Sequence, residues 1–416
     1  MINIKDFSWS VIFIWLAIAA IGLVAIYSAT LGEVSQFLPA AIQNNFFRQS
    51  TWIGISIVAL ITTQFISPRA FQSLSYVIYA ICLVLAIVTI FVGIEVGGGR
   101  RWLSIFGFRL QVSEFLKLAT ILAVANYLTH KRNMSVGNVK TAITTVGLIL
   151  LPVAIIILQN DTGTALILLT LIPVVLFWSG LPYGLSLLMI SPAIIGYFSV
   201  IGLTFGAIAA LIITIFIFFL QRQKWLTVSA AILGLLVVVG TEVALQQILQ
   251  PHQRARVEAF VNPSLDPHGA GWNVLQAKTA IGSGGLSGKG FMEGTQTQLR
   301  FLPEQWTDFV YCVVGEEFGF LGSSLLIILY GFLFLKLLSM AGAHKHPFAQ
   351  LVLVCVTFIY FAHFIVNVGS ATAMLPIMGV PLPFVSYGGS AFLANTLMLA
   401  VCLNLDLYKR SFSIYR

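Results

Sequence analysis

The sequence predicts an all-α polytopic membrane protein, a helical bundle of 10–12 transmembrane helices with a large ordered outer loop. Hydrophobic residues make up 58% of the 416 residues and charged residues only 9%, whereas about a quarter of the residues of globular proteins are charged. Apolar runs of about 20 residues, the length that crosses a bilayer, recur along the chain. They lack the alternation of apolar and polar residues, over about 10 residues, that is typical of barrel strands.

Twelve apolar runs are long enough to be candidate spans, and we treat the whole chain, 1–416, as one integral membrane domain. The run at 308–338 exceeds one bilayer thickness, so we expect its start to project into water or the helix to tilt. The runs lie at about 9–29, 50–67, 74–94, 113–129, 141–159, 162–179, 184–201, 203–220, 226–247, 308–338, 349–369 and 387–405.

The basic residues predict the orientation of these spans, because Lys and Arg are enriched in cytoplasmic loops. With the N-terminus inside, the inner side receives twelve of the 22 basic residues. Both termini are therefore predicted to be cytoplasmic. The net charge of +8 is explained by lipid headgroups and loop charges rather than by a nucleic-acid partner.

Two predicted outer segments stand out. The loop at about 95–112 holds Arg100, Arg101 and Arg109 against one acid, Glu95. Either the topology is misplaced there, or the loop binds an anionic ligand, for which the planar guanidinium fork is suited. The larger loop, about 248–307, has nearly balanced charges and many apolar residues. We expect it to form an ordered cap of short helices and turns.

Ionisable residues occur at the start of two predicted spans. Ser113 precedes an apolar helix that it can cap, and Glu114 and Lys117, three residues apart, share one face of that helix. Such residues inside a span form an ion pair, line a cavity or bind substrate. Asp161, in QNDTGTAL, begins a later span, where either simple capping or a role in the site accounts for it.

Other polar residues lie deeper in the predicted spans. Glu316 and Glu317 follow Asp308 by about two helical turns, and we expect one or both to pair with a basic residue from another helix. His363 and Asn367 lie four residues apart on one helix face. Interhelical hydrogen bonding explains them better than a metal site, because no third ligand lies nearby in the sequence.

Asp266 lies in the large outer loop and is the sole acid between Glu258 and Glu293. It precedes a proline and is followed by glycines. A turn-forming aspartate accounts for this pattern, and so does a catalytic carboxylate near the lipid headgroups. Position and residue type alone leave both interpretations open.

Five blocks of sequence resemble the SEDS family, which comprises RodA, FtsW and SpoVE. The most specific is PIMGVPLPFVSYGGS, within NVGSATAMLPIMGVPLPFVSYGGSAFLAN at 367–395. Within the family, GTQTQLRFLPEQWTDF is closer to the elongation branch than to the division branch. The other four blocks, in chain order, are GGGRRWLSIFGFRLQVSEFLKL, QNDTGTAL, DPHGAGWNVLQAKTAIGSGGLSGKG and FLPEQWTDFVYCVVGEEFGFLG.

This resemblance implies a peptidoglycan glycosyltransferase that polymerises lipid II into glycan strands during cell elongation, at the outer face of the bacterial cytoplasmic membrane. The family's essential aspartate corresponds to Asp266, which would be the general base on the C4 hydroxyl of the acceptor sugar. Candidates to neutralise the departing pyrophosphate are Arg48, Arg101, Arg109 and Lys117. The residues that match the family's polar cavity are Trp102, Gln111, Ser113, Glu114 and Asp161.

The resemblance also implies partners and cofactors. Lipid II, the growing lipid-linked glycan strand, membrane lipids and a single-pass class B penicillin-binding protein are the expected partners. A divalent cation (Mg or Mn) can assist such chemistry, but no ligand motif indicates its site, and no organic cofactor is expected. The family is expected to have ten spans rather than twelve, so we expect an inserted helical hairpin within 184–247.

Two other functions fit the composition. A lipid II flippase would need polar residues that continue to the inner side, whereas the basic residues of 95–112 and Asp266 map to the outer side. A non-catalytic scaffold for the penicillin-binding protein would keep glycan synthesis intact when Asp266 is replaced by asparagine.

Overall fold

The computed structural model describes residues 7–32, 40–96, 98–105, 108–130, 139–266 and 269–413. The chain divides into two compact units, which are described separately. Unit 1 comprises residues 1–132, 143–172 and 276–416, and unit 2 comprises 133–142 and 173–275. Helices dominate both units, and the described residues add one small sheet.

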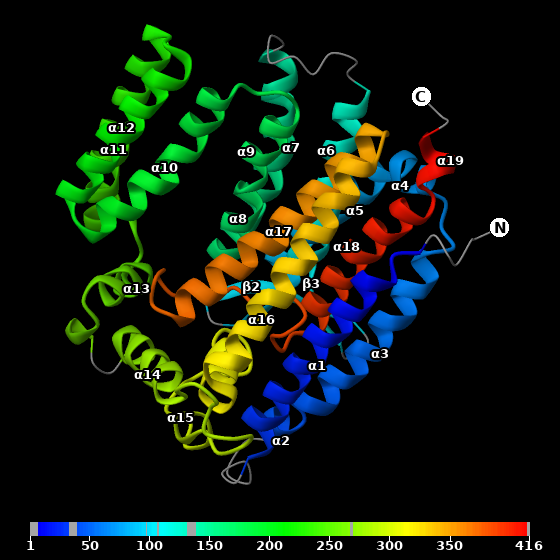
Figure 1. Ribbon diagram of the computed structural model, residues 1–416, viewed down its shortest axis with the longest axis vertical. Coiled ribbons are helices and arrows are strands. Elements are labelled where there is room, and N and C mark those ends of the chain that lie inside the picture. Colours follow the sequence, from blue (N-terminus) through cyan, green and yellow to red (C-terminus); the bar gives the residue numbers. More distant parts are fainter. Residues whose placement is uncertain are drawn as a thin grey trace. The chain divides into compact units, whose positions relative to one another are not determined.

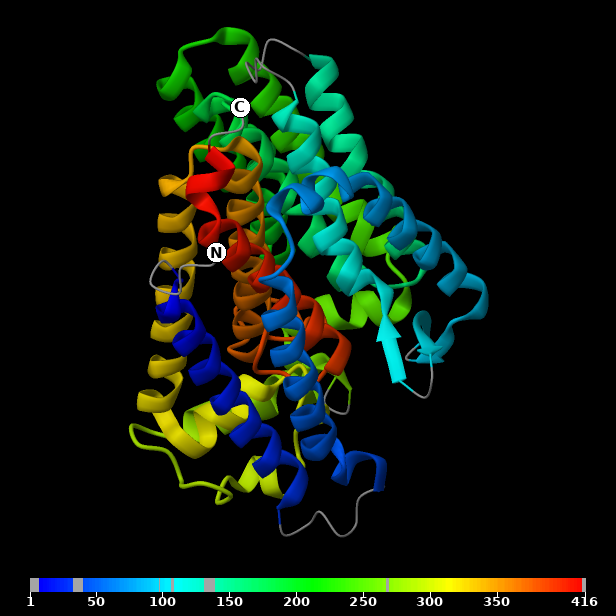
Figure 2. The same ribbon diagram turned by 90° about the vertical axis from the view of Figure 1, so that its right-hand side faces the viewer.

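Unit 1 holds most of the long helices. In both views α1 lies beside α16 (Figures 1 and 2), and α17 packs against α16 and against the buried helices α6 and α18. The helices, with α7, α9 and α14 extending across the unit boundary, are α1 (Trp9–Leu31), α2 (Ala40–Gln43), α3 (Asn45–Thr63), α4 (Pro68–Ser73), α5 (Ser75–Val92), α6 (Val112–Thr129), α7 (Val139–Leu158), α8 (Thr162–Leu169), α9 (Leu171–Trp178), α14 (Ala270–Ser283), α15 (Thr295–Gln298), α16 (Val310–Ala343), α17 (Pro347–Ala371), α18 (Gly389–Leu407) and α19 (Lys409–Ser413).

The predicted membrane architecture is confirmed. Among the described residues, ten helices are long and apolar enough to cross a membrane, which makes the chain a polytopic helical membrane protein. The other two predicted spans are also helical. The range 50–67 overlaps α3, and 162–179 is divided between α8 and α9, which meet at Thr170.

The predicted outer loop at 95–112 forms a three-stranded antiparallel sheet in its described part. Its strands are β1 (Ile94–Val96), β2 (Gly99–Ile105) and β3 (Phe108–Gln111), in the order β1-β2-β3. Trp102 lies opposite Gln111, and Ser104 lies opposite Arg109. The sheet joins α5 to α6, so its last residue, Gln111, directly precedes the buried start of α6.

The long apolar run after residue 308 becomes α16, which is broken rather than merely tilted. Gly319 has φ 64° and ψ −157°, a conformation that essentially only glycine adopts. A Cβ there would lie 2.3 Å from the backbone nitrogen of Gly288. The break leaves helix backbone groups without partners inside the helix, and the glycine-rich loop after α14 supplies them. The bonds are Lys289 N to Glu316 O, Gly290 N to Glu317 O, Phe320 N to Gly285 O and Leu321 N to Leu286 O, at 2.9–3.1 Å.

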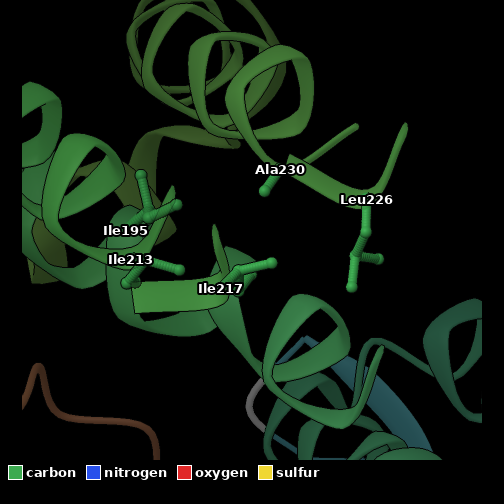
Figure 3. Close-up of a cluster of buried hydrophobic side chains, with 5 residues drawn as sticks. All are labelled: Ile195, Ile213, Ile217, Leu226 and Ala230. Atoms are coloured by element: carbon green, nitrogen blue, oxygen red, sulfur yellow. The ribbon is translucent and has the colours of Figure 1, made fainter. Parts of the chain in front are cut away.

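Unit 2 is built on three helices, α10 (Tyr183–Ile201), α11 (Leu203–Gln221) and α12 (Lys224–Val243). Their shared core contains the side chains labelled in Figure 3: Ile195, Ile213, Ile217, Leu226 and Ala230. A π turn, Ala244–Ile248, extends α12, and α13 (Pro251–Val261) and the 3-10 turn η4 (Pro263–Leu265) follow.

The segment at 248–307 contains α13, η4, α14 and α15, which confirms that it is ordered into short helices, and its place on the outer side stays a prediction. The range 184–247 contains three helices, where we expected a hairpin to be inserted. Whether two of them are an insertion stays a prediction.

Candidate functional site

Asp161 organises the main polar cluster. It is the N-cap of α8, where its Oδ1 accepts from the Thr164 backbone amide at 3.1 Å, and it is 5% exposed. Its Oδ2 accepts from Gln111 Nε2 at 2.9 Å and from Ser113 Oγ at 3.5 Å. Arg101 Nη1 lies 4.0 Å from Oδ1. Three other predicted site residues therefore lie around the Asp161 carboxylate, which also caps α8, and its role in a substrate site stays a prediction.

The neighbours of Asp161 explain why the chain folds this way locally. Gln159 is buried, and its Nε2 donates to the Ala86 carbonyl oxygen in α5 at 2.7 Å. Asn160 has φ 59°, a left-handed conformation that asparagine tolerates, and its Nδ2 donates to the Gly98 carbonyl oxygen at 2.9 Å. These two bonds hold the turn before α8 against α5 and the sheet.

A second cluster lies one turn further into α6. Lys117 Nζ lies 2.9 Å from Glu114 Oε2 and 2.8 Å from His363 Nε2 in α17. The three side chains are at most 1% exposed. The predicted Glu114–Lys117 pair therefore forms, and His363 makes the interhelical contact that we expected of it. Such a buried charge is costly unless it is paired, so the three groups depend on one another.

The C-terminal signature block contacts residues of both clusters. Asn367 Nδ2 donates to the carbonyl oxygens of Val380 at 2.8 Å and Asp308 at 3.0 Å. Both acceptors lie outside helices, so Asn367 bonds to connecting segments rather than to another helix as we expected. Ser390 Oγ accepts from the Gln111 backbone amide at 3.3 Å. Phe384 is buried at φ 67°, a strained conformation for a non-glycine residue. The block thus contacts both the Gln111 strand and the segment before α16.

Glu316 and Glu317 each have a defined environment. Glu316 is fully buried and pairs with Lys289 Nζ at 2.8 Å. It also accepts from the Gln296 and Thr297 backbone amides at 2.8 and 2.9 Å, at the start of α15. Glu317 accepts a hydrogen bond from Ser28 Oγ. The predicted basic partner exists, but it comes from the loop after α14 rather than from another helix.

The segment after α15 is fastened to the end of α1. Arg300 Nη2 and Gln305 Nε2 donate to the Ala29 carbonyl oxygen at 3.3 and 3.2 Å. The Arg300 guanidinium lies 5.8 Å from the centre of the Trp306 ring. Burial lowers the pKa of Arg300 below its usual value. The contacts with the Ala29 carbonyl oxygen and the Trp306 ring favour its charged form. Sequence reasoning missed this attachment, because nothing in the pattern links 300–306 to residue 29.

Asp266 belongs to unit 2 and directly follows η4. Its backbone carbonyl oxygen accepts from the Gly269 amide at 3.4 Å, and its side chain is partly exposed. A Cβ on Gly269 would lie 2.3 Å from Asp266 Oδ2, and one on Gly271 would lie 2.5 Å from its carbonyl oxygen. Gly269 therefore leaves the space that the Asp266 carboxylate occupies, and Gly271 leaves space for the Asp266 backbone carbonyl.

Three predicted site residues lie outside the two clusters of unit 1. Arg48 is exposed in α3, and Arg109 is exposed on β3. Trp102 is half-buried on β2, opposite Gln111. No described contact joins Arg48 or Arg109 to Asp161 or Lys117, so their roles as pyrophosphate ligands stay predictions.

A resident divalent cation would require several carboxylate, imidazole or thiolate ligands close together. No three His, Cys, Asp or Glu side chains gather as metal ligands in the part of the chain that the structure describes. The Asp161 carboxylate faces Arg101, which is a cation rather than a ligand. These residues do not fit a resident metal ion.

The chain is similar to known proteins over most of its length. The family model of cell cycle proteins named for FtsW, RodA and SpoVE matches residues 8–206 and 203–411. Peptidoglycan glycosyltransferase RodA of Treponema pallidum (strain Nichols) is 30% identical, covering 96% of this chain and 98% of that protein. Peptidoglycan glycosyltransferase MrdB of Escherichia coli (strain K12) is 31% identical, covering 87% of this chain and 85% of that protein.

A solved structure is similar over nearly the whole chain. It comes from work on the structural coordination of polymerization and crosslinking by a peptidoglycan synthase complex. It has a TM-score of 0.70 and 25% identity, and covers 97% of this chain and 98% of that chain. The chain belongs to the FtsW, RodA and SpoVE family of cell cycle proteins.

Proposed function

We propose that this protein is a peptidoglycan glycosyltransferase that polymerises lipid II into glycan strands during cell elongation. The observation that carries the proposal is the gathering of Arg101, Gln111, Ser113 and Asp161 beside the buried Glu114–Lys117 pair, at one end of apolar helices. Relatives that span nearly the whole chain are named peptidoglycan glycosyltransferases. A polar, charged site in such a helical bundle fits a phosphorylated, lipid-linked sugar substrate.

The proposed reaction is a glycosyl transfer. The C4 hydroxyl oxygen of the acceptor sugar attacks the anomeric carbon of the donor sugar, and Asp266 accepts the hydroxyl proton. The bond between that carbon and the pyrophosphate oxygen breaks, and undecaprenyl pyrophosphate leaves. Arg48, Arg101, Arg109 and Lys117 neutralise its charge, while Trp102 and Gln111 complete the surface that meets the sugars. Assistance of this step by a divalent cation (Mg or Mn) stays a prediction.

The proposal includes a location and a partner. The protein lies in the bacterial cytoplasmic membrane with both termini in the cytoplasm, because most basic residues of the short loops fall on that side. A single-pass class B penicillin-binding protein is its partner and crosslinks the glycan strands that this protein makes. Support comes from the similar chain in a peptidoglycan synthase complex that coordinates polymerization and crosslinking.

The direct test is polymerisation of purified lipid II by the detergent-solubilised protein and its cognate transpeptidase, which must lack a glycosyltransferase domain. Products are separated on a gel as a glycan ladder. Wild type and Asp266→Asn are compared, with Glu258→Gln as the matched control. Glu258 is an exposed acid of the same outer segment, paired with Arg254 at 2.6 Å.

A ladder from wild type and from Glu258→Gln, but none from Asp266→Asn, supports the transferase with Asp266 as its base. A ladder from Asp266→Asn overturns the assignment of the base. If wild type makes no ladder and lipid II crosses liposome membranes, the protein is a flippase instead.

A further inference from the structure

His363 has two hydrogen-bond partners of opposite character. Its Nδ1 lies 3.0 Å from the Pro381 carbonyl oxygen, and its Nε2 lies 2.8 Å from Lys117 Nζ. A carbonyl oxygen only accepts hydrogen bonds, so Nδ1 must carry a proton. An ammonium group only donates, so Nε2 must present its lone pair. The two contacts together specify a neutral imidazole with the proton on Nδ1.

Through these two hydrogen bonds, the His363 ring joins two parts of the site that are far apart in the sequence. Pro381 lies in the PIMGVPLPF block, and Lys117 lies in the first turns of α6. His363 comes from α17 between them, and it is 1% exposed. Asn367, one turn further along α17, holds the neighbouring carbonyl of Val380. The signature block is therefore held by Asn367, whereas the link to Lys117 runs only through His363 among these contacts.

The Lys117 side chain needs such a link. Its ammonium is fully buried, and Glu114 balances its charge from one direction. A lysine ammonium is a point charge on a flexible four-carbon stem, so one ion pair does not define its position. A second acceptor at 2.8 Å, on a ring that is itself held by a backbone carbonyl, defines it far better.

We propose that His363 is a positioning residue of the substrate site. It holds the Lys117 ammonium in place through Nε2 and ties it to the C-terminal signature block through Nδ1. This inference rests on the proposed function, because Lys117 is one of the groups assigned there to the pyrophosphate. His363 itself touches no substrate in this proposal.

Two conservative variants separate the two contacts. In His363→Gln the side-chain oxygen reaches the place of Nε2 and can accept from Lys117, but the bond to Pro381 is lost. In His363→Asn the side-chain amide takes the place of Nδ1 and can donate to Pro381, but Lys117 loses its acceptor. Thr357→Val is the control for a buried polar change in α17, because Thr357 bonds only within its own helix in the described contacts. Asn367→Leu removes the hydrogen bond to the Val380 carbonyl oxygen. It is therefore the control for weaker attachment of the signature block to α17 with His363 unchanged.

Steady-state polymerisation of lipid II is measured for each variant with the transpeptidase present. We expect kcat/KM to fall roughly tenfold or more in His363→Asn, because small misplacement of a charged group is costly to catalysis. We expect Thr357→Val to stay within about threefold of wild type. We expect His363→Gln to fall between Thr357→Val and His363→Asn, because it keeps an acceptor for Lys117 but loses the bond to Pro381. If His363→Asn equals or exceeds His363→Gln, the contact with Lys117 is not the one that matters and the proposal is overturned.

The tautomer is measured without turnover, by nitrogen NMR of the histidine-labelled protein, with the His363 signals assigned from their loss in His363→Gln. A neutral ring with the proton on Nδ1 supports the proposal, whereas a proton on Nε2 or a charged ring overturns it. Because this readout needs no substrate, it remains valid if wild type fails to polymerise lipid II. Failure of the proposed function and failure of this inference are therefore distinguishable.

Discussion

Gln111 Nε2 donates a hydrogen bond to Asp161 Oδ2 at 2.9 Å, which joins the last residue of β3 to the N-cap of α8. The sheet and α8 thereby meet at the start of α6. Because Ser113, the second residue of α6, also donates to this carboxylate, a single acid defines the relative positions of three elements. Changes at Asp161 should therefore affect both stability and substrate use.

We expect Asp161→Ala to destabilise the protein by about 1–3 kcal/mol, because it removes a helix cap and leaves the half-buried Gln111 and the buried Ser113 without their acceptor. Asp161→Asn keeps the cap, and Gln111 can rotate its amide to restore its bond. Thermal unfolding in detergent should rank Asp161→Asn near wild type in stability, although its loss of charge should lower lipid II polymerisation. Equal unfolding temperatures for the two variants would contradict this account.

The break in α16 provides a second prediction. Gly319→Ala should destabilise the fold by more than about 2 kcal/mol, because alanine is strained at φ 64° and its Cβ would meet Gly288. Gly331→Ala lies in the same helix, with no atom within 4 Å of the added Cβ, and should be neutral or stabilising by up to about 1 kcal/mol. Chemical unfolding of the two variants compares them directly, and similar losses would show that the break is unimportant.

The space beside Asp266 is testable with glycine variants. Gly269→Ala should displace the Asp266 carboxylate, because the added Cβ would lie 2.3 Å from Oδ2. We expect loss of glycan synthesis by roughly tenfold or more, with membrane insertion unchanged. Gly282→Ala, in α14, has open space around the added Cβ and serves as the control. The gel ladder measures both, and an active Gly269→Ala variant would remove the argument that this glycine positions Asp266.

The Lys289–Glu316 pair should show coupling in a double-mutant cycle. Lys289→Met leaves the buried Glu316 with only its α15 donors, and Glu316→Gln leaves Lys289 without its acid partner. We expect the two single substitutions together to lower the free energy of unfolding by more than the double substitution does. The coupling free energy should be about 1.5–3 kcal/mol, typical of hydrogen bonds to charged groups. Unfolding free energies of the four proteins provide the test, and additive effects would mean that the pair contributes little.

His344 predicts a pH dependence of stability at the predicted inner end of α16. Burial, chiefly, lowers its pKa to about 4, while Asp406, 3.9 Å away, acts in the opposite direction. The unfolded chain therefore binds more protons between about pH 4 and the ordinary value of 6.5, and stability falls as the pH falls through this window. The full effect is about 3 kcal/mol. Unfolding temperatures from pH 7.5 to 4.5 should drop less in His344→Asn than in wild type, and parallel curves would refute the assignment.

The helices were predictable because each span carries its own evidence. An apolar run of about 20 residues must satisfy its backbone internally in lipid, so α1, α5 and α17 follow from composition. The ion pair at the start of α6 was predictable as well, since Glu114 and Lys117 lie on one face of any helix. The expectation that Ser113 caps this helix was wrong: the N-cap is Gln111, and the Ser113 hydroxyl donates to Asp161 instead. The sheet at 94–111 was missed, because the arginines and glycines of this segment lack a clear two-residue alternation.

Side-chain partners from distant segments were the other class of miss. His363 was expected to bond another helix, but the sequence did not indicate Lys117 as its partner. The same holds for Lys289, which meets Glu316 through a loop, and for Arg300, which meets the end of α1. Such pairings depend on how helices pack, and packing depends on shape complementarity over many residues rather than on any local pattern.

The sequence by itself determined that the chain crosses a membrane repeatedly, where its charged residues concentrate and which family its motifs resemble, because hydrophobic length and motif spacing are local properties. Only the tertiary structure decided that Asp161 joins Arg101 and Gln111, that Gly319 breaks α16 against the loop after α14, and that His363 holds Lys117. The Gln111–Asp161 and Lys117–His363 contacts connect residues 50 and 246 positions apart. They form because a buried polar group in an apolar bundle must find a partner wherever the fold brings one within reach.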